Sequence, residues 1–113
     1  MRAALNDRYG VTFDSVLVNL YRDGRDSVAW HRDRVHKVVA NPTVVTVSLG
    51  ERRKFLLRPR GQSAAAMRFD PGHGDLIVMG GTSQRTWEHT VPKVAAAPGP
   101  RMSVTFRHSV SYL

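Results

Sequence analysis

Short apolar segments separated by glycine- and proline-rich turns run through most of this 113-residue chain, and this pattern limits what it can fold into. Hardly any stretch has a helical period, and β-branched residues are frequent in the segments, as is typical of strands. The expected strands cover residues 12–21, 27–31, 43–49, 54–58, 67–69, 75–79, 85–91 and 102–110. They predict an all-β domain, with one short helix over residues 1–10. The periodicity does not choose a jelly roll over another all-β architecture.

Two parts of this series carry more specific expectations. The apolar run 75–79 predicts a buried strand. Segments 43–49 and 54–58 are joined by Gly50-Glu51-Arg52-Arg53, which predicts a hairpin. The basic residues along this hairpin would suit a phosphate backbone, or would protect an edge strand from aggregation. They are Arg52, Arg53, Lys54, Arg58 and Arg60.

Composition narrows the class of protein. The length suits a single domain, 1–113, and the absence of cysteine excludes disulfides and thiolate zinc sites. No apolar run approaches the roughly 20 residues of a membrane span, and the N-terminus has no signal-type segment. We therefore expect a cytoplasmic monomer without a membrane partner. The 17 basic and 9 acidic residues give a net charge of +8, which favours nucleic acid as a partner or reflects a GC-rich genome.

A metal site is the first candidate for chemistry. His31 and Asp33 lie two positions apart, so on a strand they face the same way at about 6.6 Å. His89, 58 positions later, is the best-placed third ligand. Two histidines and one carboxylate on one face of a metal are the ligands of non-haem Fe(II) oxygenases. The alternative for this short His/Asp pair is a solvated loop or an ordinary hydrogen bond.

The last expected strand carries a second candidate site. Arg101 and Arg107 share one of its faces with Ser103 and Thr105, and the apolar residues between them pack behind. Inward-facing arginines need an anionic partner in bidentate geometry, and a dicarboxylate co-substrate that also chelates iron would satisfy this need. The alternative is a solvated face on an edge strand.

Five segments in order resemble the motifs of the AlkB family of Fe(II)- and 2-oxoglutarate-dependent dioxygenases. The resemblance runs from about residue 12 to 108 and rests on Asn19-Leu20-Tyr21-Arg22-Asp23-Gly24, Trp30-His31-Arg32-Asp33, residues 74–79, Gln84 to Lys93, and Arg101 to Arg107. It implies a double-stranded β-helix, or jelly roll, with Fe(II) held by His31, Asp33 and His89.

The resemblance also implies how the co-substrates are used. Asn19, Tyr21, Arg101 and Arg107 would bind 2-oxoglutarate, with Ser103 where the family often has asparagine. With O2, the enzyme would hydroxylate an N-methyl group of a DNA or RNA base and release it as formaldehyde.

The sequence departs from the family in the part that recognises substrate. Val35, after Arg34, stands where the family usually has a polar or acidic residue, and we expect these 113 residues to form the catalytic core without the family's N-terminal nucleotide-recognition lid. Either the chain is a fragment or the substrate is held differently, with Trp30, Arg34, Val35 and Arg85 as the remaining candidates for substrate contact. The alternative for Trp30 is packing in the wall of the pocket, and the alternative for Arg85 is a plain surface position. A non-catalytic nucleic-acid-binding barrel, or an oxygenase acting on a protein or small molecule, stays open as an alternative function.

Overall fold

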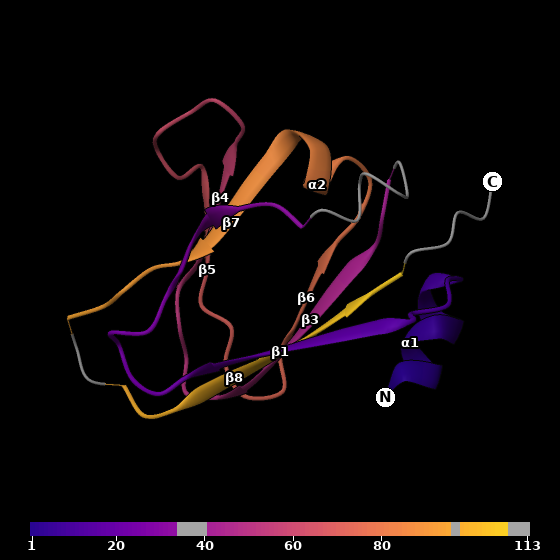
Figure 1. Ribbon diagram of the computed structural model, residues 1–113, viewed down its shortest axis with the longest axis horizontal. Helices are drawn as coiled ribbons and strands as arrows, with labels where there is room; N and C mark the ends of the chain where they lie inside the picture. The colour runs from indigo at the N-terminus through magenta and orange to yellow at the C-terminus, as the bar shows by residue number, and fades with distance from the viewer. Residues whose placement is uncertain (34–40, 96–97, 109–113) are drawn as a thin grey trace.

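Two four-stranded antiparallel sheets make up the core of the protein, as the computed structural model in Figure 1 shows for residues 1–33, 41–95 and 98–108. The first sheet has the order β1-β8-β3-β6 and the second has β2-β7-β4-β5. The strands are β1 (Ser15–Tyr21), β2 (Val28–His31), β3 (Val44–Gly50), β4 (Phe55–Pro59), β5 (Met67–Phe69), β6 (Leu76–Met79), β7 (Trp87–Val91) and β8 (Arg101–Arg107). The mainly β, jelly-roll prediction is confirmed.

The chain moves between the two sheets at nearly every connection. Among the described strands, β4 and β5 are the one pair of consecutive strands that lie in the same sheet. The predicted hairpin of β3 with β4 is therefore wrong. β3 pairs with β6 and β8 in the first sheet, whereas β4 pairs with β5 and β7 in the second. Residues 51–54 cross from one sheet to the other, a path that turn chemistry alone does not distinguish from a hairpin.

Two short helices accompany the sheets. α1 (Arg2–Tyr9) ends at Gly10, whose φ of 66° is the left-handed conformation that glycine adopts at little cost, so the helix predicted over residues 1–10 is confirmed. α2 (Ser83–Thr86) lies directly before β7 and occupies the first two positions of the strand expected over 85–91. No helix in the described part of the chain is long and apolar enough to cross a bilayer.

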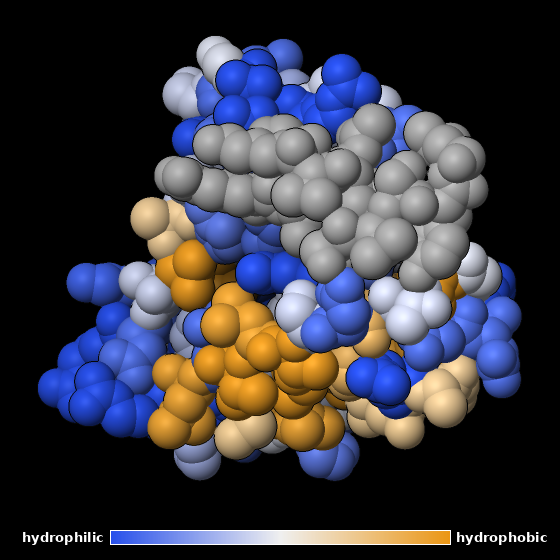
Figure 2. Space-filling model, turned by 45° about the vertical axis from the view of Figure 1, so that its right-hand side comes forward, coloured by the Kyte–Doolittle hydropathy of each residue, from blue (hydrophilic) through white to orange (hydrophobic). Residues whose placement is uncertain are grey.

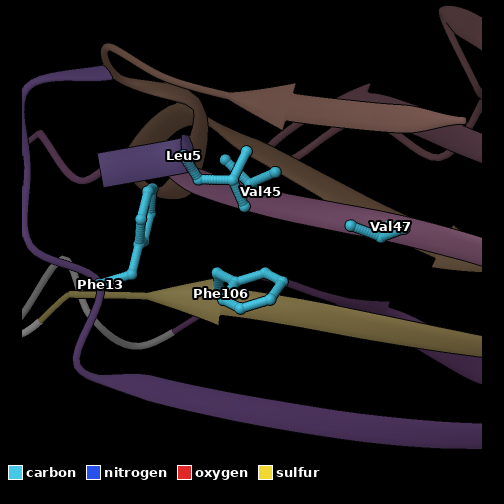
Figure 3. Packing of buried hydrophobic residues seen from close by; sticks show 5 residues of the cluster. All are labelled: Leu5, Phe13, Val45, Val47 and Phe106. Atoms are coloured by element: carbon cyan, nitrogen blue, oxygen red, sulfur yellow. The ribbon is translucent and has the colours of Figure 1, made fainter. Parts of the chain in front are cut away.

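The apolar core has two parts, one on each face of the first sheet. Between the sheets, Tyr21 and Val44 from the first pack with Phe55 and Val91 from the second. On the outer face, Leu5 of α1 packs on Phe13, Val45, Val47 and Phe106, as Figure 3 shows. α1 thus covers one part of the outer face of the first sheet.

The rest of that outer face is exposed. Figure 2 shows hydrophobic side chains gathered on the surface, and the exposed apolar residues include Val16, Val18 and Leu20 of β1. Leu76 and Val78 of β6 are 49% and 40% exposed, so the prediction of a buried strand over 75–79 is wrong. β6 is an edge strand, and an apolar run alone does not reveal that one of its faces is left partly exposed.

Strand register brings the inward-facing polar residues together. In the first sheet, Tyr21 pairs with Arg101 and Asn19 with Ser103, and Ser48 lies opposite Ser103 from the other side. In the second sheet, His31 pairs with His89. The inner faces of the two sheets thus bring residues from distant parts of the chain to one cavity.

Candidate active site

His31, Asp33 and His89 come together at one point of this cavity. One ligand atom from each residue lies within 4.8 Å of the others, and within the described residues they form the one such group of His, Asp or Glu that could hold a metal. His31 Nε2 is 3.8 Å and His89 Nε2 is 3.9 Å from Asp33 Oδ1. The donor set of two imidazoles and a carboxylate, with His31 partly open to solvent, fits Fe(II).

Hydrogen bonds and packing orient the two imidazoles. His31 Nδ1 lies 2.7 Å from the Ala29 carbonyl oxygen and donates to it, which leaves Nε2 free to face Asp33. The His89 ring stacks on Phe55 at 5.4 Å. Burial, reinforced by His31, lowers the pKa of His89 to about 4. His89 is therefore neutral at pH 7, the state in which imidazole binds metals.

Asp33 lies two residues beyond the end of β2 rather than on the strand, so its position depends on tertiary contacts. Its backbone N–H donates to Gln84 Oε1 at 2.8 Å, and Gln84 Nε2 contacts Met79 Sδ at 3.5 Å. Its carboxylate accepts a hydrogen bond from Arg107 Nη2 at 3.2 Å. Gln84 of α2 is completely buried, so it fixes the backbone of Asp33 from the side of the second sheet.

Arg101 marks a second, anion-seeking end of the same cavity. It is only 2% exposed, and its Nη2 donates to Ser48 Oγ at 2.8 Å. Its Nε and Nη1 have no hydrogen-bond partner within the described residues. Burial lowers the pKa of Arg101 and raises that of Tyr21, whose ring centroid is 5.1 Å from the guanidinium carbon. A buried guanidinium with two unused donors fits a carboxylate.

Asn19 and Ser103 line the cavity between these two ends, with Arg107 and Thr105 closer to Asp33 along β8. All eight residues expected to bind iron or 2-oxoglutarate thus line one cavity; they are Asn19, Tyr21, His31, Asp33, His89, Arg101, Ser103 and Arg107. Their roles in binding iron and 2-oxoglutarate stay predictions.

The residues expected to contact a substrate are less closely placed. Trp30 lies outside the cavity lining and packs under Arg58 at 4.2 Å, in line with the alternative of a wall residue. Arg85 is exposed on α2, and its carbonyl accepts a hydrogen bond from Arg60. Arg34 and Val35 lie outside the described residues.

The basic residues at 52–60 do not form one surface. Arg58 pairs with Glu88, Arg52 and Arg60 donate to main-chain carbonyls, and Arg53 is buried. The interpretation of this run as a single phosphate-binding stripe loses its support once the hairpin is absent.

Sequence reasoning missed three buried polar residues that hold the site together: Ser48, Arg53 and Gln84. A signal was available for Ser48, because Thr46 and Ser48 alternate with valines in β3 and so share its inner face. The Thr46 and Thr105 hydroxyls meet there at 3.1 Å. Gln84 gave no local signal, because its partner Asp33 is 51 positions away.

Comparison with known proteins follows the same lines. A sequence-family model described as the 2OG-Fe(II) oxygenase superfamily matches residues 2–107. The alpha-ketoglutarate-dependent dioxygenase alkB homolog 3 of Homo sapiens is 32% identical over 115 residues, covering 95% of this chain and 40% of that protein. The DNA oxidative demethylase ALKBH2 of Arabidopsis thaliana is 35% identical over 120 residues, covering 87% of this chain and 38% of that protein. The resemblance to AlkB-type proteins is confirmed.

A solved structure shows the same similarity in three dimensions. OsALKBH1 superposes with a TM-score of 0.68 at 27% identity, covering 87% of this chain and 49% of the other. The chain spans about 40% of the length of the relatives it matches in sequence.

Proposed function

The chain belongs to the 2OG-Fe(II) oxygenase superfamily, and on that premise we propose that it is an AlkB-type dioxygenase that removes methyl groups oxidatively from bases in DNA or RNA. The observation that carries the proposal is the single cavity with His31, Asp33 and His89 at one end and Arg101 at the other, two of whose donors have no partner among the described residues. A metal and a dicarboxylate would together satisfy both ends.

The two ends would have separate tasks. His31, Asp33 and His89 would hold Fe(II), which together with 2-oxoglutarate and O2 supplies the oxidising chemistry when bound. Overall, 2-oxoglutarate, O2 and an N-methyl base would give succinate, CO2, formaldehyde and the unmethylated base.

The residues of this chain would bind and orient. Arg101 would pair with the distal carboxylate of 2-oxoglutarate beside the Tyr21 phenol, while donating to Ser48 Oγ. Arg107 donates to Asp33 and so orients that carboxylate in the site. Because Arg101 and Asp33 are both almost fully buried, water would be displaced from the two polar ends of the co-substrate.

The proposed substrate class rests on the relatives and on charge. ALKBH2 of Arabidopsis thaliana is described as a DNA oxidative demethylase, and a net charge of +8 on 113 residues favours a polyanion. Cytoplasmic location and a monomeric state stay predictions.

Succinate formation tests the proposal most directly. The protein, loaded with Fe(II) and supplied with O2 and 2-oxoglutarate, is expected to form succinate, and formaldehyde when a methylated oligonucleotide is added. His31→Ala is expected to lower succinate formation at least about 100-fold, because a metal ligand is lost. His73→Ala is the matched control, since His73 is exposed and lies outside the cluster.

Each result separates the alternatives. Equal succinate formation by His31→Ala and the unaltered protein would overturn the iron assignment. Succinate without formaldehyde from DNA or RNA would favour a protein or small-molecule substrate. Binding of oligonucleotides without succinate would favour a non-catalytic barrel.

A further inference from the structure

Arg53 is a buried cation that the proposed chemistry leaves without a role. It lies in the connection between β3 and β4 and is 3% exposed. Within the described residues it has no carboxylate partner, since the acids nearest to it in the loop after β1 pair elsewhere. Asp23 pairs with Arg25, and Asp26 pairs with Arg22.

Main-chain carbonyls instead bind the two terminal nitrogens of the Arg53 guanidinium, while its Nε is buried without a hydrogen-bond partner among the described residues. Nη1 donates to the Asp23 carbonyl at 3.0 Å, and Nη2 donates to the carbonyls of Asp26 and Pro92, both at 2.8 Å. These carbonyls belong to the loop between β1 and β2 and to the segment directly after β7. The planar fork of one side chain thus ties together three connections at the arginine end of the cavity.

Arg53 also reaches the residues that face the cavity. Its guanidinium carbon lies 5.4 Å from the centroid of the Tyr21 ring, and that of Arg101 lies 5.1 Å from the same centroid. Both contacts are within the range of cation–π interactions. Arg53, Tyr21 and Arg101 therefore form a packed group with two buried positive charges.

The two buried positive charges of this group favour binding of an anion. Burial lowers the pKa of Arg101, and the nearby charge of Arg53 lowers it further, so the two buried guanidiniums repel each other. Arg101 lines the cavity, and its Nε and Nη1 are buried without a hydrogen-bond partner among the described residues. A second carboxylate on the ligand would relieve this repulsion, whereas a ligand with a methyl group at that position would leave it in place.

We propose that Arg53 is a positioning residue that sets the preference of the site for a 2-oxo acid with a second carboxylate, by holding Tyr21 and Arg101 in place and adding its charge behind them. This rests on the proposed function, because it assumes that 2-oxoglutarate occupies the cavity. Arg53 does not touch the ligand.

The test compares two ligands of equal chain length. 2-Oxovalerate has a methyl group where 2-oxoglutarate has its distal carboxylate. The dissociation constant of 2-oxovalerate divided by that of 2-oxoglutarate therefore measures the preference for that carboxylate. Both are titrated calorimetrically, without O2, into the full chain loaded with Mn(II). Arg53→Met is expected to reduce the ratio about tenfold, since charged hydrogen-bonding groups act at this strength. A general loss of structure would weaken both ligands and leave the ratio unchanged.

A neighbour provides the matched control. Arg52→Met removes the same charge one position away, from an exposed side chain that donates to the Asp70 carbonyl, and is expected to leave the ratio unchanged. Arg53→Lys keeps the positive charge but loses the planar guanidinium, so we expect a ratio between those of the unaltered protein and Arg53→Met. Should Arg53→Met fail to fold, the ratio of Arg53→Lys tests the proposal.

A wild-type ratio in the folded Arg53 variants, or an equal loss in Arg52→Met, would overturn the proposal. Failure of the unaltered protein to bind 2-oxoglutarate would instead overturn the proposed function.

Discussion

The residues that line the site carry more positive than negative charge. The cavity lining holds one carboxylate, Asp33, against the guanidiniums of Arg101 and Arg107. An additional positive charge on His89 would be costly here, and burial together with His31 keeps its pKa near 4. His89 is therefore prepared to accept a metal without first losing a proton at neutral pH.

A neutral buried histidine makes stability depend on pH. Between pH 6.5 and 4, His89 carries a proton in the unfolded chain but not in the folded protein, so acid favours unfolding. We expect the free energy of unfolding of the metal-free protein to fall by on the order of 3 kcal/mol across this window. Urea unfolding in the presence of a chelator, at several pH values, measures it.

Two variants isolate the contribution of His89. His89→Gln removes the titrating group, so the fall in stability toward pH 4 is expected to become shallower. His73→Gln removes an exposed imidazole outside the metal cluster, whose Nδ1 accepts a hydrogen bond from the Gly50 N–H, and gives the slope change caused by losing a histidine elsewhere. An unchanged slope in His89→Gln would show that the acid sensitivity arises elsewhere.

Among single residues, those with recognisable ligand chemistry could be predicted from the sequence, and the buried residues that position them could not. Spacing and motif order identified His31, Asp33 and His89, because ligand types in a set pattern carry the signal. Arg53 and Gln84 were hidden, because each acts on a residue distant in sequence through a hydrogen bond or ring contact. Nothing in a local window distinguishes such a buried polar residue from a surface one.

At the scale of elements, the crossing from β3 to β4 shows what strand prediction leaves open. The sequence placed both strands within one or two residues of their observed bounds. It assigned them to one hairpin, because Gly50 with polar neighbours is turn chemistry in either arrangement. Sheet membership instead depends on pairing with β8 and β7, which lie far along the chain.

Gly50 makes this crossing possible. Its φ is 92°, and a Cβ built there would lie 2.5 Å from the Pro100 carbonyl oxygen, which is main chain and has little room to move. Gly50→Ala is therefore expected to destabilise the protein by about 2–4 kcal/mol, from backbone strain and steric overlap together. Chemical denaturation measures the change.

Gly61 is the matched control at this scale. Its φ of 83° is similar, but nothing lies within 4 Å of the added Cβ. Gly61→Ala should lose only the conformational part, about 1 kcal/mol. Equal losses in the two variants would show that the contact with Pro100 does not limit the crossing.

The two faces of the first sheet differ chemically. The space between the sheets holds polar and charged groups from both, whereas the outer face of the first sheet is apolar and only partly covered by α1. The sequence predicted that the apolar residues of β8 pack behind the arginines; Phe106 is buried there and Val104 packs against it, but Met102 is exposed. The extent of cover could not be predicted, because it depends on where α1 lies.

One pair of valines separates exposure from residue type on this face. Val16 and Val45 both lie opposite Phe106, on either side of it, but Val16 is 52% exposed and Val45 is completely buried. Val→Thr keeps the shape and the strand preference and replaces one methyl group by a hydroxyl. The same substitution therefore tests whether the face beyond α1 is open in solution.

Val16→Thr, combined with Val18→Thr, is expected to change the free energy of unfolding by less than about 0.5 kcal/mol and to reduce the fluorescence of a bound hydrophobic dye. Val45→Thr buries a hydroxyl and is expected to destabilise by about 1–3 kcal/mol without lowering dye binding by the folded protein. Denaturation and dye titration measure both variants. Should the double variant destabilise as much as Val45→Thr, the β1 half of this face is covered in solution, and the sheet would then be apolar on that side because it is packed there.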